Sequence, residues 1–499
     1  MAVDSYLEDN TFDTNGIFGF IDQNGYRAEY LNPIPAAETM PAMASFETGS
    51  YPSRHGIISN VFRLKGNNIS ETTYGYTSQF GSESIWEVAA RQGKKVIRIG
   101  SIFEHGYKKS PNGVKTITQS SPTGYSKIVS LQADDSVWEN YDGEHYDFIQ
   151  PLMSEESNDG AVTLEIVDPR EITLKIYALA VDTLIDGIEE YNAIILDDDK
   201  DLNNGFKAIL SLSQWSIIEI TKIYGFRIGT WIKILEFDSN SKLAKLYISA
   251  PQMNSGYPEK FISVIEDEMG LPPGGPDFAL YNNGLLSESM IIEQIDREMS
   301  YVIKTALFAI QNMTFDLLPV DYPIMDRYGH NFMLTHTRQS EYDAESGRKR
   351  ERFESYIKDA YVEGNNTLKM IHSLLRDSDA MIISSDYGLA PVYSRIAVNK
   401  ILSDAGIEVT SDDKSEVRAY AGSTTANVYI NLEGREPEGT VPENEYDNYV
   451  ERIKSALNSY RDSETGEKVF DLVLSSEDFH DVGINGAAGA GDVWVRLTQ

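Results

Sequence analysis

A run of strand-like segments interrupts an otherwise alternating helix-and-strand pattern in this chain of 499 residues. Before residue 131 and after residue 265, amphipathic helical segments alternate with short apolar segments, which is typical of an α/β core. Between these two parts, apolar and polar residues alternate over several segments separated by turn residues, as in antiparallel strands. We therefore expect an α/β core formed by residues 1–130 and 266–499, with a β-rich insertion, residues 131–265, that caps it.

Apolar spacing and turn residues place the individual helices and strands. Core helices are expected at residues 82–92, 288–312, 348–376 and 445–461. Core strands are expected at residues 94–102, 315–323, 379–385 and 427–432. Insertion strands are expected at residues 161–167, 171–181, 191–199, 216–226, 230–237 and 244–250, with a hairpin turn at 238–241.

The chain is strongly acidic, because 43 lysines and arginines face 77 aspartates and glutamates, which gives a net charge of −34. Such a surface repels polyanions and argues against binding to a nucleic-acid duplex or an anionic membrane. A small phosphate ester remains a compatible substrate where metal cations override the local field. The absence of cysteine excludes disulfides, thiolate catalysis and cysteine metal sites.

Membrane and export signals are absent from the sequence pattern. No stretch of about 18 apolar residues predicts a membrane span, and the N-terminus has neither a basic region nor an apolar region of a signal peptide. The lack of cysteine and the acidic surface favour an extracytoplasmic protein, whereas the missing signal segment keeps a cytoplasmic location open. The oligomeric state leaves no mark in the sequence.

Three segments carry residues suited to phosphate or metal chemistry, and each also has an ordinary structural explanation. Asp386 follows the apolar segment 379–385, where open α/β sheets bind ligands, although an aspartate can also cap a turn there. Asp326 and His330 lie four residues apart and can share one helical face, either to hold a cation or as a surface ion pair. A helix starting at Thr39 would aim N–H groups at an anion, unless the threonine merely caps it.

Together these segments resemble the type I phosphodiesterase/nucleotide pyrophosphatase family of the alkaline phosphatase superfamily. Residues 33–60 resemble its nucleophile segment, in which threonine-x-proline is followed by TG-x-x-P-x-x-HGI and an asparagine, here Asn60. Asp326-x-x-Gly-His330 resembles the D-x-x-G-H metal segment, and Ser385-Asp386-Tyr387-Gly388 resembles the S-D-H-G segment.

Two further segments extend the resemblance along most of the chain outside the insertion. Asp4 looks like the aspartate that ends the first strand of this fold. Residues 427–441 resemble a GREPEG segment of the predicted phosphohydrolase/phosphomutase group in the same superfamily. The resemblance implies an alkaline-phosphatase-like, mostly parallel sheet flanked by helices, with the β-rich insertion as a cap domain.

The family's chemistry implies a metal-dependent phosphoric ester hydrolase, similar to phosphodiesterases and pyrophosphatases, that acts on a small phosphate ester. Thr39 would be the nucleophile and form a phospho-threonine, and Asn60 would donate its amide to a phosphate oxygen. The resemblance implies one or two divalent ions, zinc or alternatively manganese, because carboxylate and imidazole ligands suit both. Their ligands would be Asp4, Thr39 and Asp386 for one ion and Asp326 and His330 for the other.

The sequence departs from the family at two metal-site positions. Tyr387 stands where the family has a histidine, and a phenol with a pKa of about 10 is a poor ligand. The last histidine, His480, lacks the family's G-x-H-G context. Together with the abrupt start before Asp4, this indicates either a trimmed chain or an altered metal site. The alternative is therefore a catalytically degenerate family member that binds a phosphorylated ligand or partner without turnover.

Other prominent residues receive structural interpretations. We expect His55 to order its own loop rather than bind metal. Trp215 and Trp231 are expected to pack in the insertion rather than to form a sugar platform. Arg435 and Glu436 are expected to form a structural ion pair. Sulfatase chemistry is the weakest alternative, because the chain has no cysteine and the nucleophile position is a threonine.

Overall fold

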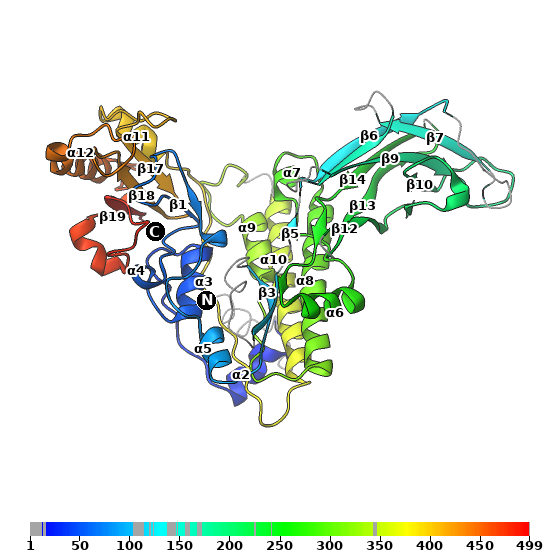
Figure 1. Ribbon diagram of the computed structural model, residues 1–499, viewed down its shortest axis with the longest axis horizontal. Coiled ribbons are helices and arrows are strands. Elements are labelled where there is room, and N and C mark those ends of the chain that lie inside the picture. Colours follow the sequence, from blue (N-terminus) through cyan, green and yellow to red (C-terminus); the bar gives the residue numbers. More distant parts are fainter. Residues whose placement is uncertain are drawn as a thin grey trace.

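A computed structural model gives the fold of the protein (Figure 1). The structure describes residues 12, 16–102, 114–118, 121–122, 124–136, 146, 148–154, 160–166, 172–223, 226–240, 242–342 and 347–498. Figure 1 shows three parts: a large sheet at one end, a smaller sheet with two helices at the other, and a group of long helices between them. The protein is therefore a mixed α/β structure, as the sequence pattern indicates.

The large sheet is an antiparallel sheet of 11 strands that lie between residues 121 and 253. Its strands are β5 (Ser121–Pro122), β6 (Lys127–Ala133), β7 (Ile149–Ser154), β8 (Val162–Ile166), β9 (Ile172–Val181), β10 (Ala193–Asp197), β11 (Ala208–Ser211), β12 (Trp215–Ile223), β13 (Phe226–Asp238), β14 (Leu243–Ile248) and β15 (Gln252–Met253). The main path runs β11-β10-β9-β7-β6-β14-β13-β15-β5, with β8 paired to β9 and β12 paired to β13.

One cluster of buried apolar side chains packs within this sheet. It includes Leu164 of β8, Ala178 and Ala180 of β9, Ile218 of β12 and Leu246 of β14. The predicted hairpin is confirmed, because β13 pairs antiparallel with β14 and Asp238 lies opposite Leu243. The strands of the sheet lie between residues 121 and 253. The division into a core and a cap of residues 131–265 stays a prediction.

A group of helices, of which α8 and α10 are the longest, forms the middle of the molecule (Figure 1). They are α2 (Ile17–Asn24), α6 (Glu259–Met269), α7 (Phe278–Asn282), α8 (Glu288–Asn312), α9 (Ile324–Phe332) and α10 (Gly347–His372). Helix α8 starts where Ser287 accepts a hydrogen bond from the N–H of Met290, a normal N-cap. Its buried residues Ile291, Ile295 and Met299 repeat every four positions and form one apolar face. The predicted helix at 288–312 is thereby confirmed.

A small sheet next to these helices carries the parallel pairing of the fold. It has the order β16-β4-β3, and β3 (Val96–Ser101) pairs parallel with β4 (Val114–Thr118), while β16 (Gly256–Tyr257) pairs antiparallel with β4. Isolated parallel bridges join β3 to Leu317 and Val320. The predicted strand at 315–323 is thus reduced to two bridges.

The second end of the molecule is a four-stranded antiparallel sheet of order β17-β18-β20-β19. Its strands are β17 (Val417–Ala421), β18 (Thr425–Ile430), β19 (Phe470–Ser475) and β20 (Val493–Leu497). Helices α11 (Val398–Asp404) and α12 (Tyr446–Ser459) share one apolar cluster with its strands. A second cluster joins Trp494 to Ile58 and Phe62, so the sheet also contacts the N-terminal segment that carries Thr39.

That N-terminal segment is built from short elements. They are α3 (Thr39–Thr48), α4 (Pro52–His55), β1 (Val61–Phe62), β2 (Thr73–Tyr74), the 3-10 turn η1 (Gly75–Thr77) and α5 (Ile85–Arg91). The remaining 3-10 turns are η2 (Leu202–Asn204), η4 (Glu443–Glu445) and η5 (Ser476–Val482). Helix α5 starts with a capping box between Ser84 and Glu87, which confirms the helix predicted at 82–92.

Two expectations about the core are corrected. The mostly parallel sheet is absent from the described part of the chain, where parallel pairing is confined to β3–β4 and isolated bridges. The strand predicted at 379–385 does not form, and Ile382 is 89% exposed. An apolar run indicates a preference for burial, but a strand also needs a neighbouring strand to satisfy its backbone groups, and no described strand pairs with this segment.

Candidate functional site

Thr39 is the first residue of helix α3, as the sequence predicts. The helix ends at Gly49, which adopts a left-handed conformation with φ of 60° that glycine accepts without strain. The Thr39 side chain is half-buried, and its Oγ1 lies 2.9 Å from the hydroxyl oxygen of Tyr387. The positive end of the α3 dipole and the backbone N–H of Thr39 therefore lie next to this hydroxyl.

Asn60 lies directly beside the start of α3. Its Oδ1 accepts a hydrogen bond from the N–H of Met40 at 2.8 Å, and its own N–H donates to Glu38 Oε2 at 2.9 Å. Because the amide oxygen is occupied by Met40, the NH₂ half of the Asn60 amide is the half that can donate to a ligand. The structure thus brings together Thr39 and Asn60, 21 positions apart, as the resemblance implies.

Glu38 organises this corner of the site, and sequence reasoning missed it. The residue is only 1% exposed. Besides the Asn60 N–H, its carboxylate accepts hydrogen bonds from the hydroxyl of Ser59 at 2.7 Å and from that of Thr425 at 3.0 Å. Since Thr425 begins β18, Glu38 joins the start of α3 to the C-terminal sheet. No local signal in the sequence marks Glu38, because its three partners lie 21, 22 and 387 positions away.

Asp326 and His330 project from the same face of α9. His330 Nε2 lies 3.2 Å from Asp326 Oδ1, as expected for residues four apart in a helix. The hydrogen bond that the His330 ring donates to the Asp326 carboxylate raises the pKa of His330. Arg327, the residue after Asp326, forms two hydrogen bonds of 3.1 Å with the buried Glu298, which fixes α9 on α8. The two side chains can therefore present one oxygen and one nitrogen to a single cation.

Tyr387 connects the two parts of the site. Besides the contact with Thr39, its hydroxyl lies 3.4 Å from Asp326 Oδ1. The neighbouring Asp386 accepts a hydrogen bond from the N–H of Tyr387 at 3.1 Å. Burial raises the pKa of Asp386 to about 6, and the charges of Asp326 and Asp321 add to this effect. Thr39 and Asp326 therefore both lie close to the hydroxyl group of Tyr387.

Tyr76 is a second tyrosine at Thr39 that sequence reasoning missed. It lies in η1, and its hydroxyl interacts with the Thr39 side chain while burial raises its pKa. The preceding Gly75 packs so closely on Met40 that an added Cβ would meet the Met40 Cβ at 2.7 Å. The glycine at position 75, which this close approach requires, is the sequence signal that could have pointed to η1.

The two other predicted site residues are His480, which is not brought to this cluster, and Asp4. Asp4 lies outside the described residues. His480 lies in η5, where its side chain is 68% exposed and contacts Asp481 at 2.9 Å and the carbonyl of Glu477. Its contacts thus lie within its own turn, as expected for a histidine without the family's G-x-H-G context.

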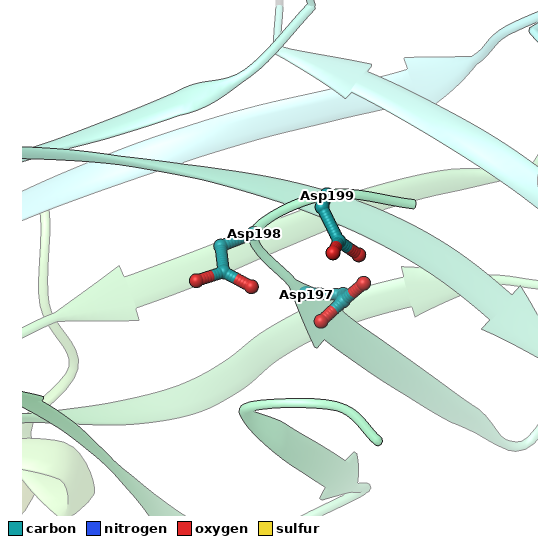
Figure 2. A group of neighbouring side chains, drawn as sticks. All are labelled: Asp197, Asp198 and Asp199. Carbon is teal, nitrogen blue, oxygen red and sulfur yellow. The ribbon is translucent and has the colours of Figure 1, made fainter. Parts of the chain in front are cut away.

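The donor chemistry fits a metal in part. Asp326 and His330 supply the mixed oxygen and nitrogen ligands that suit zinc or manganese. A third ligand atom close to both is not found within the described ranges, where the one convergent group of three acidic side chains is Asp197, Asp198 and Asp199 in the large sheet (Figure 2). Asp326 and His330 can present their ligand atoms to one cation, and the charge of Asp326 acts on the carboxyl group of Asp386.

Three structural interpretations made from the sequence are confirmed. His55 is fully buried, accepts a hydrogen bond from the N–H of Ile57 and contacts Ser45, so it orders its loop. The rings of Trp215 and Trp231 pack against protein groups, since Arg297 lies against both. Arg435 and Glu436 form an ion pair of 2.8 Å. Among the described residues, no helix combines the length and apolar character needed to cross a membrane.

Comparison with known proteins identifies the family. The structure is similar to two crystal structures of phosphonoacetate hydrolase from Sinorhizobium meliloti 1021, one with phosphonoformate and one with phosphonoacetate. Both are 12% identical and cover 99% of this chain and 77% of that chain, with TM-scores of 0.41 and 0.42. No curated protein matches the sequence. The model of one family, described as type I phosphodiesterase / nucleotide pyrophosphatase, matches residues 5–165 and 246–497, which is more than half of the chain. The chain therefore belongs to the type I phosphodiesterase / nucleotide pyrophosphatase family.

Proposed function

We propose that this protein is a metal-dependent phosphoric ester hydrolase that uses Thr39 as its nucleophile. The observation that carries the proposal is the position of Thr39, whose hydroxyl stands at the N-terminus of α3 beside Tyr387 and the Asp326–His330 pair. A helix N-terminus favours the negative charge of a phosphate group. Family membership supports a phosphate ester as the substrate.

The reaction has two displacements at phosphorus. In the first, Thr39 Oγ loses its proton and forms a bond to phosphorus, while the bond to the leaving alcohol oxygen breaks and that oxygen gains a proton. In the second, water attacks the phospho-threonine, the bond between phosphorus and Thr39 Oγ breaks, and Thr39 regains its proton. A covalent intermediate divides one difficult substitution into two easier ones.

The residues around Thr39 can stabilise the charge that develops on the phosphate oxygens. The NH₂ group of Asn60 can donate to one oxygen, and the backbone N–H of Thr39 can donate to another. Because Glu38 and Met40 hold Asn60 by its backbone and its amide oxygen, the donor is oriented before substrate binds. Such preorganised donors lose little in reorganisation during the reaction.

Asp326 and His330 would hold one divalent cation, zinc or manganese, and Asp386 with Thr39 and Asp4 would hold another. Bound there, such a cation would supply positive charge to the phosphate oxygens and favour the ionised form of the nucleophile. The small phosphate ester would thereby overcome the repulsion expected from a chain with a net charge of −34.

A second function is a catalytically degenerate protein that binds a phosphorylated ligand or partner. The position of Tyr387 favours this second function. The phenol stands where the family has a histidine, and its hydroxyl oxygen lies at hydrogen-bond distance, 2.9 Å, from Thr39 Oγ1. In this case the site would bind phosphate through Asn60 and the α3 N-terminus without a competent nucleophile. Ligand affinity would then not depend on the Thr39 hydroxyl.

Hydrolysis of bis-nitrophenyl phosphate with added zinc or manganese separates the two functions. We expect metal-dependent nitrophenol release by the wild type and a loss of at least about a thousandfold in Thr39→Ala. Thr48→Ala is the matched control, because Thr48 lies at the other end of α3 and its hydroxyl donates within the helix to Ala44. Equal release by the wild type and Thr39→Ala would contradict the threonine mechanism, and metal-dependent phosphate binding without release would support the degenerate protein.

A further inference from the structure

An acidic cluster lies in the large sheet, away from Thr39. Strand β10 ends at Asp197, and Asp198 and Asp199 follow directly. Figure 2 shows the carboxyl groups of Asp198 and Asp199 extending toward that of Asp197. One oxygen of each carboxyl group lies within 4.8 Å of the others. Three negative groups at this separation repel one another unless a proton or a positive charge, such as the Lys207 ammonium paired with Asp198, offsets the repulsion.

Asp197 gives the cluster an unsatisfied buried atom. The residue is 1% exposed, and its Oδ2 has no hydrogen-bond partner. An unpartnered buried carboxylate oxygen is strongly unfavourable, so the position calls for a cation or a proton. Every residue of β10 is buried, so this carboxyl group cannot turn to solvent without disturbing the strand.

The two exposed members of the cluster are held in place by other contacts. Asp199 accepts hydrogen bonds from the N–H of Asp201 at 2.9 Å and from the amide of Asn204 at 2.6 Å. Asp198 forms an ion pair with Lys207 at 2.9 Å. Since both carboxyl groups face solvent on one side, a cation could reach the buried Asp197 oxygen between them.

We propose that Asp197, Asp198 and Asp199 bind a hard divalent cation of the calcium type. All the ligand atoms are oxygens, which Ca²⁺ prefers. Ca²⁺–oxygen distances of about 2.3–2.6 Å place two ligands of one ion at most about 5 Å apart, in agreement with the observed cluster. Waters and main-chain carbonyls would complete the coordination. The cation would fasten the turn between β10 and β11 to the sheet.

Calcium titration of the full-length protein near neutral pH tests this site. We expect Ca²⁺ alone to raise the melting temperature of the wild type, and Asp197→Asn to weaken Ca²⁺ binding more than about tenfold by calorimetry. Asp199→Asn should also weaken Ca²⁺ binding. Because Asp199 is exposed, this variant tests the site even if Asp197→Asn does not fold. Terbium provides a second reading, because Tyr177 is paired with Asp197 across β9 and β10 and can sensitise its emission.

Two control variants separate this site from the site at Thr39. Asp186→Asn removes an exposed charge from a neighbouring turn, where Asp186 accepts the N–H of Ile188, and should leave the calcium response unchanged. Asp326→Asn should abolish any metal response of the Thr39 site but preserve the calcium response. A calcium response that is equal in wild type and Asp197→Asn, or lost in Asp326→Asn, would overturn the proposal. The absence of any calcium response in the wild type would also overturn the proposal. In that case a proton on Asp197 would reduce the repulsion within the cluster, since burial raises the pKa of Asp197.

Discussion

The hydroxyl of Tyr387 lies 2.9 Å from Thr39 Oγ1 and 3.4 Å from Asp326 Oδ1, so one phenol links the proposed nucleophile to the proposed metal ligand. A phenol has a single proton and can donate to only one of these oxygens. Burial raises the pKa of Tyr387, so the group is neutral near physiological pH. A neutral phenol therefore holds this position as a much weaker metal ligand than an imidazole nitrogen would be.

Replacing Tyr387 with histidine should therefore strengthen metal binding. We expect Tyr387→His to bind zinc at least about tenfold more tightly than the wild type, because it adds a nitrogen ligand beside Asp386. Calorimetric titration with zinc measures the change. Tyr387→Phe is the control, since it removes the hydroxyl without adding a ligand. Equal zinc affinity of all three proteins would show that this position does not face a metal.

Glu38 should prove necessary for both stability and turnover. Its carboxylate accepts hydrogen bonds from Ser59, Asn60 and Thr425 in a buried position. Glu38→Ala leaves these donors without an acceptor, and each buried unsatisfied donor costs about 1–3 kcal/mol. We also expect kcat to fall about 10–100-fold, because Asn60 loses its fixed position beside Thr39. Urea unfolding and nitrophenol release measure the two effects.

The conservative variant distinguishes positioning from charge. Glu38→Gln keeps an oxygen for Ser59 and Asn60, and its new amide N–H can donate to the rotatable hydroxyl of Thr425. Glu38→Gln should therefore keep most of the stability and activity that Glu38→Ala loses. If both variants lose activity equally while remaining folded, the negative charge of Glu38 itself matters, and the positioning account is wrong.

His55 should make the protein sensitive to mild acid. Burial lowers the pKa of His55 from 6.5 to about 4. The unfolded chain therefore takes up a proton near pH 6.5 that the folded protein refuses until about pH 4, so stability falls as the pH decreases through this window. The loss reaches about 3 kcal/mol when complete, since one pKa unit corresponds to about 1.4 kcal/mol.

Unfolding free energies measured across that pH window for wild type and His55→Gln check this effect. His55→Gln should be less stable than the wild type near neutral pH but lose less stability on acidification. His480→Gln is the control, because the exposed His480 should leave the pH dependence unchanged. Comparing each variant with the wild type cancels the opposite contribution of Asp386, whose raised pKa favours the folded state in acid. Parallel pH curves for wild type and His55→Gln would contradict this account.

Local signals in the sequence predict the helices and part of the site. The start of α8 follows from the cap Ser287 and a regular apolar spacing, and the pairing of Asp326 with His330 follows from helix geometry. The start of α3 at Thr39 was predictable from the small residues that follow it and from the family resemblance. These features depend on neighbours within a few positions of the chain, which a single sequence displays directly.

Features that depend on distant partners were not predictable. The apolar segment 379–385 looks like a buried strand, but its conformation depends on strands elsewhere in the chain, and Ile382 is exposed. Glu38 acquires its role from Thr425, 387 positions away, and Tyr76 from the fold of η1 against Met40. The sequence also shows that Tyr387 replaces a family histidine, but its contact with Thr39 is visible only in three dimensions.

Arg297 should anchor the large sheet to the central helices. Its guanidinium lies 4.0 Å from the ring centre of Trp215 and 4.2 Å from that of Trp231, and it projects from α8. Burial lowers the pKa of Arg297 to about 10, so it remains charged near neutral pH. A desolvated cation between two indole faces stabilises by about 2 kcal/mol or more. We expect Arg297→Ala to lose at least that much in urea unfolding followed by tryptophan fluorescence.

Arg297→Lys tests whether the planar group matters, since an ammonium keeps the charge but cannot stack flat between two rings, and it should recover only part of the loss. Arg376→Ala is the control for charge removal, because the Arg376 side chain is 77% exposed in a local pair with Asp379 and should contribute little to stability. If Arg297→Ala is as stable as Arg376→Ala, the sheet is held to α8 by its other contacts, such as the hydrogen bond of 2.7 Å from Trp215 to Glu293.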